Sequence, residues 1–175
     1  WPIRRFRTRF PTRAQPVLPC AMPKRLAHRC RRRPPFFHPV PLRARRDGWS
    51  IERQCAFLAQ LYLTGSVGAA AHCVGMSRHS AYRLRTREGA ESFAHAWDSV
   101  LTPPGTGRRH APRTDWRKVT VPQLIWLIET GLVQPVIHRG RMTALRRKAE
   151  NSALLRLLRR IDANEPGASD GPPGC

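Results

Sequence analysis

Residues 66–87, SVGAAAHCVGMSRHSAYRLRTR, have the pattern of two short helices joined by a three-residue turn. Ala71 is small enough for a second helix to cross it closely, and Gly75 suits a turn position with a positive φ angle. Ser77 follows as a residue type that caps helix N-termini. The sequence therefore predicts a helix-turn-helix whose second helix begins after Ser77.

The second helix of this motif is predicted to have an apolar side and a basic side. Ala81 and Leu84 are spaced to face inward, next to an apolar turn. The outer side would enter a major groove, where arginine donates to N7 and O6 of guanine. Two helices with a solvated, arginine-rich side also occur in ordinary bundles, which is the structural alternative. The predicted DNA-binding residues are Ser77, Arg78, His79, Tyr82, Arg83, Arg85 and Arg87.

The charge balance favours a polyanionic partner. The 175 residues include 32 Lys and Arg against 11 Asp and Glu, which gives a formal net charge of +21. Such an excess is typical of proteins that bind nucleic acid. A membrane-spanning helix would need about 18 consecutive apolar residues, and the run at 58–63 is too short. We expect a cytoplasmic, nucleoid-associated protein that binds double-stranded DNA, with no membrane or small-molecule partner.

Proline and charge divide the sequence into five segments. Residues 1–47 hold fourteen Lys or Arg, nine prolines and one acidic residue, so we expect a disordered basic arm. This arm either neutralises phosphates or is a solvated tail, and Met22 within it is one position at which translation could begin. The other expected segments are a helix-turn-helix domain at 48–101, a linker at 102–114, a helix-hairpin-helix module at 115–162 and a disordered tail at 163–175.

Two further helices are expected to complete the domain at 48–101. Ser50 is placed to cap the first of them and Gly65 to end it, whereas Pro103 stops the second. Apolar residues recur at helical spacing in both helices. They are Ile51, Cys55, Leu58, Leu61 and Tyr62 in the first, and Phe93, Trp97, Val100 and Leu101 in the second.

The C-terminal module is predicted to contain a helix, a hairpin and a final helix. Thr120 is placed to cap the first helix and Gly131 to end it. Two short strands, 133–138 and 142–147, meet at Arg139, although arginine is a poor first residue for a type I′ turn. Asn151 is expected to cap the last helix, with Leu154, Leu157, Leu158 and Ile161 facing inward and Arg156, Arg159 and Arg160 facing out.

No pattern in the sequence indicates an enzyme, a cofactor or a metal site. The five cysteines have no CxxC spacing, and Cys55 and Cys73 occupy apolar positions of predicted helices. The phosphate-binding motif GxxxxGK[ST] is absent, and the seven histidines are scattered. We therefore expect a protein without catalytic residues.

Two stretches resemble a known group of proteins. Residues 48–98, GWSIERQCAFLAQLYLTGSVGAAAHCVGMSRHSAYRLRTREGAESFAHAWD, resemble the DNA-binding part of small helix-turn-helix proteins common in alphaproteobacteria, which are similar in turn to phage terminase small subunits. Residues 135–160, PVIHRGRMTALRRKAENSALLRLLRR, resemble the strand-turn-strand-helix ending of the same group. The resemblance implies DNA binding and, in the terminase case, presentation of a packaging-initiation site to a large ATPase and nuclease subunit. The recognition role would fall on Ser77, Arg78, His79, Tyr82 and Arg83.

The sequence thus predicts a mainly α protein. It combines a small homeodomain-like helix-turn-helix bundle, a small α+β-hairpin C-terminal module and a disordered basic N-terminal arm. The predicted function is DNA binding, as a transcriptional regulator or a terminase small subunit-like protein. The alternative is a non-catalytic adaptor that binds RNA or protein through its basic arm. A homo-oligomer is a further hypothesis, since one short recognition helix rarely specifies a DNA site alone.

Overall fold

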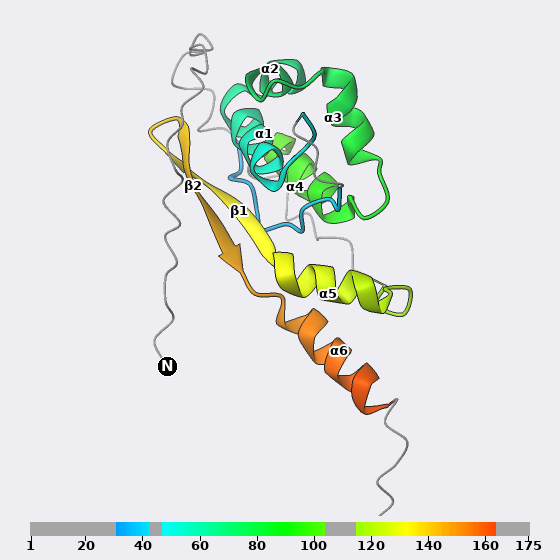
Figure 1. The fold of residues 1–175 in the computed structure, drawn as a ribbon. Helices are drawn as coiled ribbons and strands as arrows, with labels where there is room; N and C mark the ends of the chain where they lie inside the picture. Colours follow the sequence, from blue (N-terminus) through cyan, green and yellow to red (C-terminus); the bar gives the residue numbers. More distant parts are fainter. Residues whose placement is uncertain (1–30, 43–46, 104–114, 164–175) are drawn as a thin grey trace, which may run out of the picture.

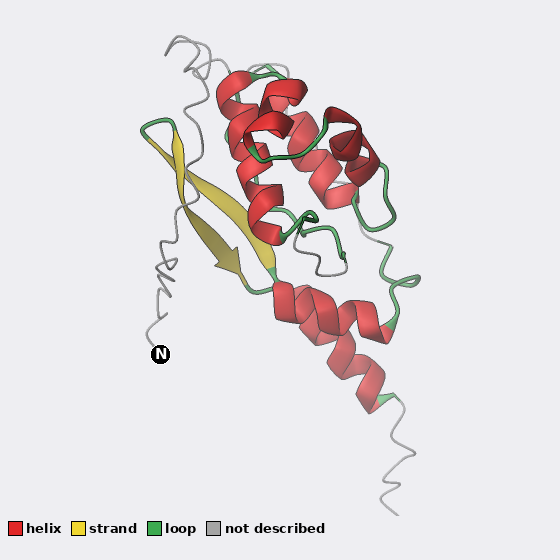
Figure 2. Ribbon diagram, turned by 45° about the horizontal axis from the view of Figure 1, so that its top comes forward, coloured by secondary structure: helices red, strands yellow, loops and turns green. Residues whose placement is uncertain are grey.

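The computed structural model describes residues 31–42, 47–103 and 115–163 (Figure 1). Within these ranges the chain is mainly helical, with one two-stranded antiparallel sheet (Figure 2). The elements are α1 (Ile51–Thr64), α2 (Val67–Cys73), α3 (Arg78–Arg85), α4 (Glu91–Leu101), α5 (Val121–Thr130), β1 (Leu132–His138), β2 (Arg141–Lys148) and α6 (Asn151–Asp162). The helices α1 to α4 form a bundle, which we call the head, and the hairpin leads from it to α5 and α6.

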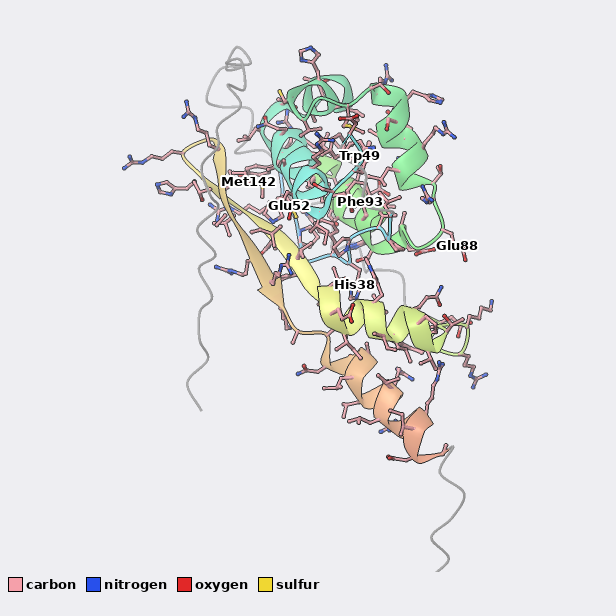
Figure 3. The ribbon with its side chains drawn as sticks, viewed as in Figure 1. His38, Trp49, Glu52, Glu88, Phe93 and Met142 are labelled. Atoms are coloured by element: carbon pink, nitrogen blue, oxygen red, sulfur yellow. The ribbon has the colours of Figure 1, made fainter. Side chains whose placement is uncertain are left out.

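Aromatic side chains fill the centre of the head. The ring centroids of Phe57 and Trp97 are 4.7 Å apart, and Phe93 lies 6.1 Å from Trp97. Trp49 packs edge-on against Phe57 at 5.6 Å, so residues before α1 also belong to this core (Figure 3). Large, tilted ring pairs of this kind bury much apolar area and stabilise a small domain. The predicted core positions Phe93 and Trp97 are thereby confirmed as buried.

The ends of α1 lie where the sequence predicted them. The Ser50 side chain accepts a hydrogen bond from the backbone N–H of Arg53, which is the capping interaction expected of serine at this position. At the other end Gly65 has a φ of 68°, a left-handed conformation that glycine adopts without strain. The guanidinium of Arg31 donates to the carbonyls of Tyr62 and Leu63 and so satisfies two acceptors of the last turn.

Residues 31–42 are part of the core, which corrects the expectation that the whole of 1–47 is a disordered arm. Phe37 is fully buried, and its backbone forms a two-bond antiparallel bridge with Val133 of β1. The buried side chain of Gln54 accepts from the Val40 N–H and donates to the Val40 carbonyl. Composition alone was misleading, because Phe37 and Val40 gain their apolar partners from distant segments. Residues 1–30 and 43–46 of the predicted arm lie outside the described residues.

The hairpin has the strands and the turn that were predicted. Arg139 and Gly140 both have positive φ angles, 47° and 75°, as a type I′ turn requires. The register shifts between Val136 and Ile137, where the partner strand passes from Ala144 to Met142. Arg139 thus has a left-handed backbone conformation, which is unfavourable for a residue with a Cβ atom.

The hairpin packs on α1, and this differs from the expected separation of two modules. Val133 belongs to the same buried cluster as the core of the head, and Ile137, Met142 and Leu145 pack against that cluster. As a result α1 is covered on two sides: the hairpin packs on one, and Trp49 and α4 cover the other, where Phe57 is buried against Trp97. Most of the predicted linker, 104–114, lies outside the described residues.

The helices α5 and α6 form a pair at the end of the hairpin far from its turn (Figure 1). Thr120 and Gln123 form a reciprocal capping box at the start of α5, and Gly131 follows its end, as predicted. The cap of α6 is Glu150 and not Asn151: its carboxylate accepts from the Ser152 N–H. Asn151 is already the first helical residue, so the cap position falls on Glu150, two residues after the end of β2.

The expected inward face of α6 is wrong for three of its four residues, and the fourth, Leu157, is half-buried. Leu154, Leu158 and Ile161 are 42%, 47% and 49% exposed, and the buried residue of this helix is Ala153. Only one helix, α5, packs along α6, so its second apolar side has no cover within the described residues. The predicted tail from 164 onward lies outside them.

Candidate nucleic-acid interface

The turn between α2 and α3 has the conformation that its residues predicted. Gly75 has a φ of 71°, and a Cβ atom at this position would meet nothing within 4 Å. The requirement for glycine is therefore conformational and not steric. The Met76 N–H donates to the Ala71 carbonyl at 2.9 Å and closes the turn, while Ser77 caps α3 by accepting from the Ser80 N–H. These bonds fix the direction in which α3 leaves the turn.

The inner side of α3 is held by both apolar and polar contacts. Ala81 and Leu84 are buried, as predicted. Ser80 accepts a 2.8 Å hydrogen bond from the indole N–H of Trp49, which ties the first turn of α3 to the segment before α1. At the last turn Arg85 forms a 2.8 Å ion pair with Asp98 of α4. Both ends of the helix are thus fixed to the head.

The outer side of α3 is exposed and basic. The guanidinium of Arg78 lies 5.6 Å from the centroid of the Tyr82 ring, a cation–π arrangement between neighbouring turns. Arg87 is exposed in the turn that follows the helix, beside Glu88, which lies at the edge of the head (Figure 3). The exposed members of the predicted site are Ser77, Arg78, His79, Tyr82, Arg83 and Arg87.

Arg85 stands apart from the other predicted site residues. Its side chain is 33% exposed, its charge is paired with Asp98, and its guanidinium lies 5.5 Å from the centroid of the Trp97 ring. Sequence reasoning grouped it with the other arginines because Asp98 is distant in the chain. The structure places Arg85 between α3 and α4, where it joins the two helices.

Tyr82 has a mixed position. It is 37% exposed, yet its ring centroid lies 5.6 Å from that of Trp97. The ring therefore contacts the core at Trp97, while part of it remains at the surface beside the guanidinium of Arg78.

A second basic surface was missed in the sequence. It lies on the hairpin, and we call it the hairpin basic surface. The signal was present, because residues 139–148 contain five cationic residues and no acidic one. Figure 1 places the hairpin and α3 on different sides of α1, so the two basic surfaces are separate. The residues of the hairpin basic surface, all exposed, are Arg139, Arg141, Arg146, Arg147 and Lys148.

No protein-family profile, curated protein or solved structure matches this chain. The resemblance to helix-turn-helix proteins and terminase small subunits stays a prediction. The geometry of α3 and the charges around it carry the functional argument.

The described residues contain no cluster of metal ligands. In the ranges that the structure describes, no three His, Cys, Asp or Glu side chains gather into a group that could hold a metal ion. Burial raises the pKa of the Cys55 thiol to about 12, so this cysteine is uncharged at neutral pH and behaves as an apolar core residue. Across the same ranges, every helix is too short or too polar to cross a bilayer.

Proposed function

We propose that the chain binds double-stranded DNA through the outer side of α3. In this proposal α2, the turn at Gly75 and α3 are a helix-turn-helix of homeodomain-like type, and α3 lies in the major groove. The N-terminal half of α3 carries Arg78 and His79, and one turn further the same side carries Tyr82 and Arg83. Such spacing suits a helix that presents side chains to successive base pairs.

One observation carries the proposal: the polar side chains of α3 are sorted by side. Ser80 and Arg85, on the inner side, have partners within the protein. The outer side has two arginines and no acidic residue within α3. Since guanidinium groups recognise guanine edges and phosphates, the outer side is complementary to DNA.

The proposed mechanism has two parts. Arg78, His79 and Arg83 place donors at base edges, and arginine is the usual partner of guanine N7 and O6. The large net charge of +21 supplies phosphate attraction without regard to sequence, so affinity falls steeply as salt concentration rises. The protein acts without a catalytic site or cofactor, in the bacterial nucleoid, as a regulator or in DNA packaging.

The test begins with equilibrium selection of the full chain on a library of randomised duplexes. Fluorescence anisotropy then compares the enriched duplex with a shuffled one across a salt series. The full chain is needed, because a fragment beginning at Asp47 would remove Phe37 from the core. We expect Arg78→Ala/Arg83→Ala to lose roughly tenfold or more of the preference for the enriched duplex per arginine.

Arg139→Ala/Arg141→Ala is the matched control, because it removes the same charge from the hairpin basic surface. We expect it to weaken both duplexes alike and to keep the preference. An unchanged preference in the α3 variant, with its circular dichroism intact, would contradict the proposal. Binding that depends only on cations outside α3 would instead favour the adaptor alternative, in which the basic arm binds RNA or protein.

A further inference from the structure

Exposed apolar side chains are concentrated on α5 and α6. Among the described residues, eight large hydrophobic side chains are exposed, and six of these lie on this helix pair. Three of them, Leu154, Leu158 and Ile161, follow one another at the i, i+4, i+7 spacing of a single helix side, and we call them the α6 stripe. Exposed clusters of this kind mark interaction surfaces, whereas single exposed leucines do not.

The α6 stripe is separate from the side that packs on α5. With about 100° per residue, Ala153, Leu157 and Arg160 share one side of the helix, and the stripe lies roughly a quarter turn further round. Ala153 is buried and the other two are half-buried, in agreement with this division. The helix therefore has two apolar sides, one of which is used within the chain.

Two of the three arginines of α6 are turned away from the stripe. Arg160 donates to the carbonyls of Trp116 and Val119, and Arg156 lies 4.7 Å from the centroid of the Trp116 ring. These contacts hold both guanidinium groups over the segment before α5. On the exposed side the stripe is bordered by Arg159 and Asp162, one charge of each sign.

We propose that two copies of the chain pair through the α6 stripe, with Val121 and Ile125 of α5 at its flank, to give a two-fold dimer with a four-helix contact. Two chains of charge +21 repel each other, so the contact that adds least to this repulsion is one without cations, and the stripe is an apolar surface from which two of the three α6 arginines are withdrawn. An apolar, charge-balanced side is self-complementary, as a two-fold contact requires. Two helices from each copy would close a small bundle core, which one pair cannot do.

The exposed area agrees with a dimer of ordinary size. The five side chains of the proposed contact are 42% to 49% exposed. Together they present on the order of 400 Å² of apolar surface, close to the apolar share of an interface that buries about 800 Å² per partner. The dimer goes beyond the proposed DNA binding, and it would bring two α3 helices into one particle.

Sedimentation equilibrium of the full chain, without nucleic acid and at high salt, tests the proposal. We expect a dimer mass that decreases on dilution, and a monomer mass for Leu154→Glu/Leu158→Glu at all concentrations. Leu101→Glu, a matched change at an exposed leucine of α4, should remain dimeric. Leu158→Gln, which keeps the helix and adds no charge, should shift the equilibrium towards monomer by about tenfold or more.

Two results would overturn the dimer: a monomeric wild-type chain over the whole concentration range, or a Leu154→Glu/Leu158→Glu variant that stays dimeric with unchanged circular dichroism. If the double variant loses helix, Leu158→Gln decides in its place. The measurement contains no DNA, so its failure would leave the proposed DNA binding standing. Conversely, loss of DNA binding in the α3 variant would leave the dimer standing.

Discussion

His38 shows how one half-buried residue connects three parts of the chain. Its backbone N–H donates to the Ser92 hydroxyl of α4, and its Nε2 atom lies 3.4 Å from a carboxylate oxygen of Glu150, the cap of α6. The residue lies between the head and α5 (Figure 3). Burial lowers the pKa of His38 from its ordinary value of 6.5, and Glu150 together with the backbone of Gly131 opposes that shift.

This pKa shift predicts a loss of stability in mild acid. The unfolded chain binds the His38 proton more readily than the folded chain, because the folded pKa is the lower one. Its contribution to stability is therefore complete above 6.5 and is lost as the pH falls below that value towards the folded pKa. We expect the urea midpoint of the wild-type chain to decrease over this range.

His38→Gln supplies the comparison for that pH profile. The variant lacks the titrating group at position 38 and keeps the other histidines. We expect the difference in urea midpoint between wild type and variant to change with pH below 6.5 and to be constant above it. Two parallel profiles would mean that His38 has the same pKa in both states of the chain.

Single residues differ in how far the sequence revealed their role. Ser77 and Gly75 were predictable, because a cap and a positive φ depend on the residue and its nearest neighbours. Arg85 was not, since Asp98 and Trp97 come to it from α4 through the fold. The same holds for Gln54, whose partner Val40 lies fourteen positions away in a segment that composition marked as an arm.

At the scale of elements, local signals located every helix of the described chain, but for α1 and α6 they did not reveal which sides are covered. An amphipathic pattern says that a helix has an apolar side, but it does not say what packs there. For α1 the hairpin covers a second side, and for α6 only α5 is present. Segment 31–42 has no periodic pattern at all, and it joins the core through contacts with distant segments, among them the bridge to β1 and the hydrogen bonds of Gln54.

The connection between α4 and α3 depends on Trp97. Its ring is 1% exposed and contacts Phe57 and Phe93, while Tyr82 and Arg85 of α3 lie against it. We expect Trp97→Ala to cost about 3–5 kcal/mol in unfolding free energy. Hydrogen exchange should show α3 losing protection together with α4, because both helices lose the same contact.

Trp97→Phe tests whether that loss comes from the ring contact. Phenylalanine keeps an aromatic ring in the core, so we expect a smaller destabilisation and retained protection of α3. If Trp97→Ala leaves the melting temperature and helical circular dichroism unchanged, the packing role described for this residue is wrong.

At the scale of the whole molecule, three stretches of sequence share one core. Phe37 comes from the first stretch, Phe57 and Phe93 from the second, and Val133 from the third, and all four are fully buried in one cluster. Pro-rich composition around 104–114 suggested a boundary between modules, yet a linker in the sequence does not prevent the segments on either side from packing together. The net positive charge, in contrast, could be counted from the composition alone. Only the structure showed that its cations form two separate surfaces, one on α3 and one on the hairpin.

A shared core predicts that damage to the hairpin reaches the head. Val133→Ala removes two buried methyl groups from β1, where the side chain joins the core cluster, and should cost about 2 kcal/mol. Hydrogen exchange of the α1 amides should rise by the same factor as that of the hairpin, because both open in one cooperative step. Val136→Ala, a half-buried position of the same strand, should have a much smaller effect on either. If Val133→Ala loosens the hairpin while α1 keeps its full protection, the head folds independently and the chain has two units after all.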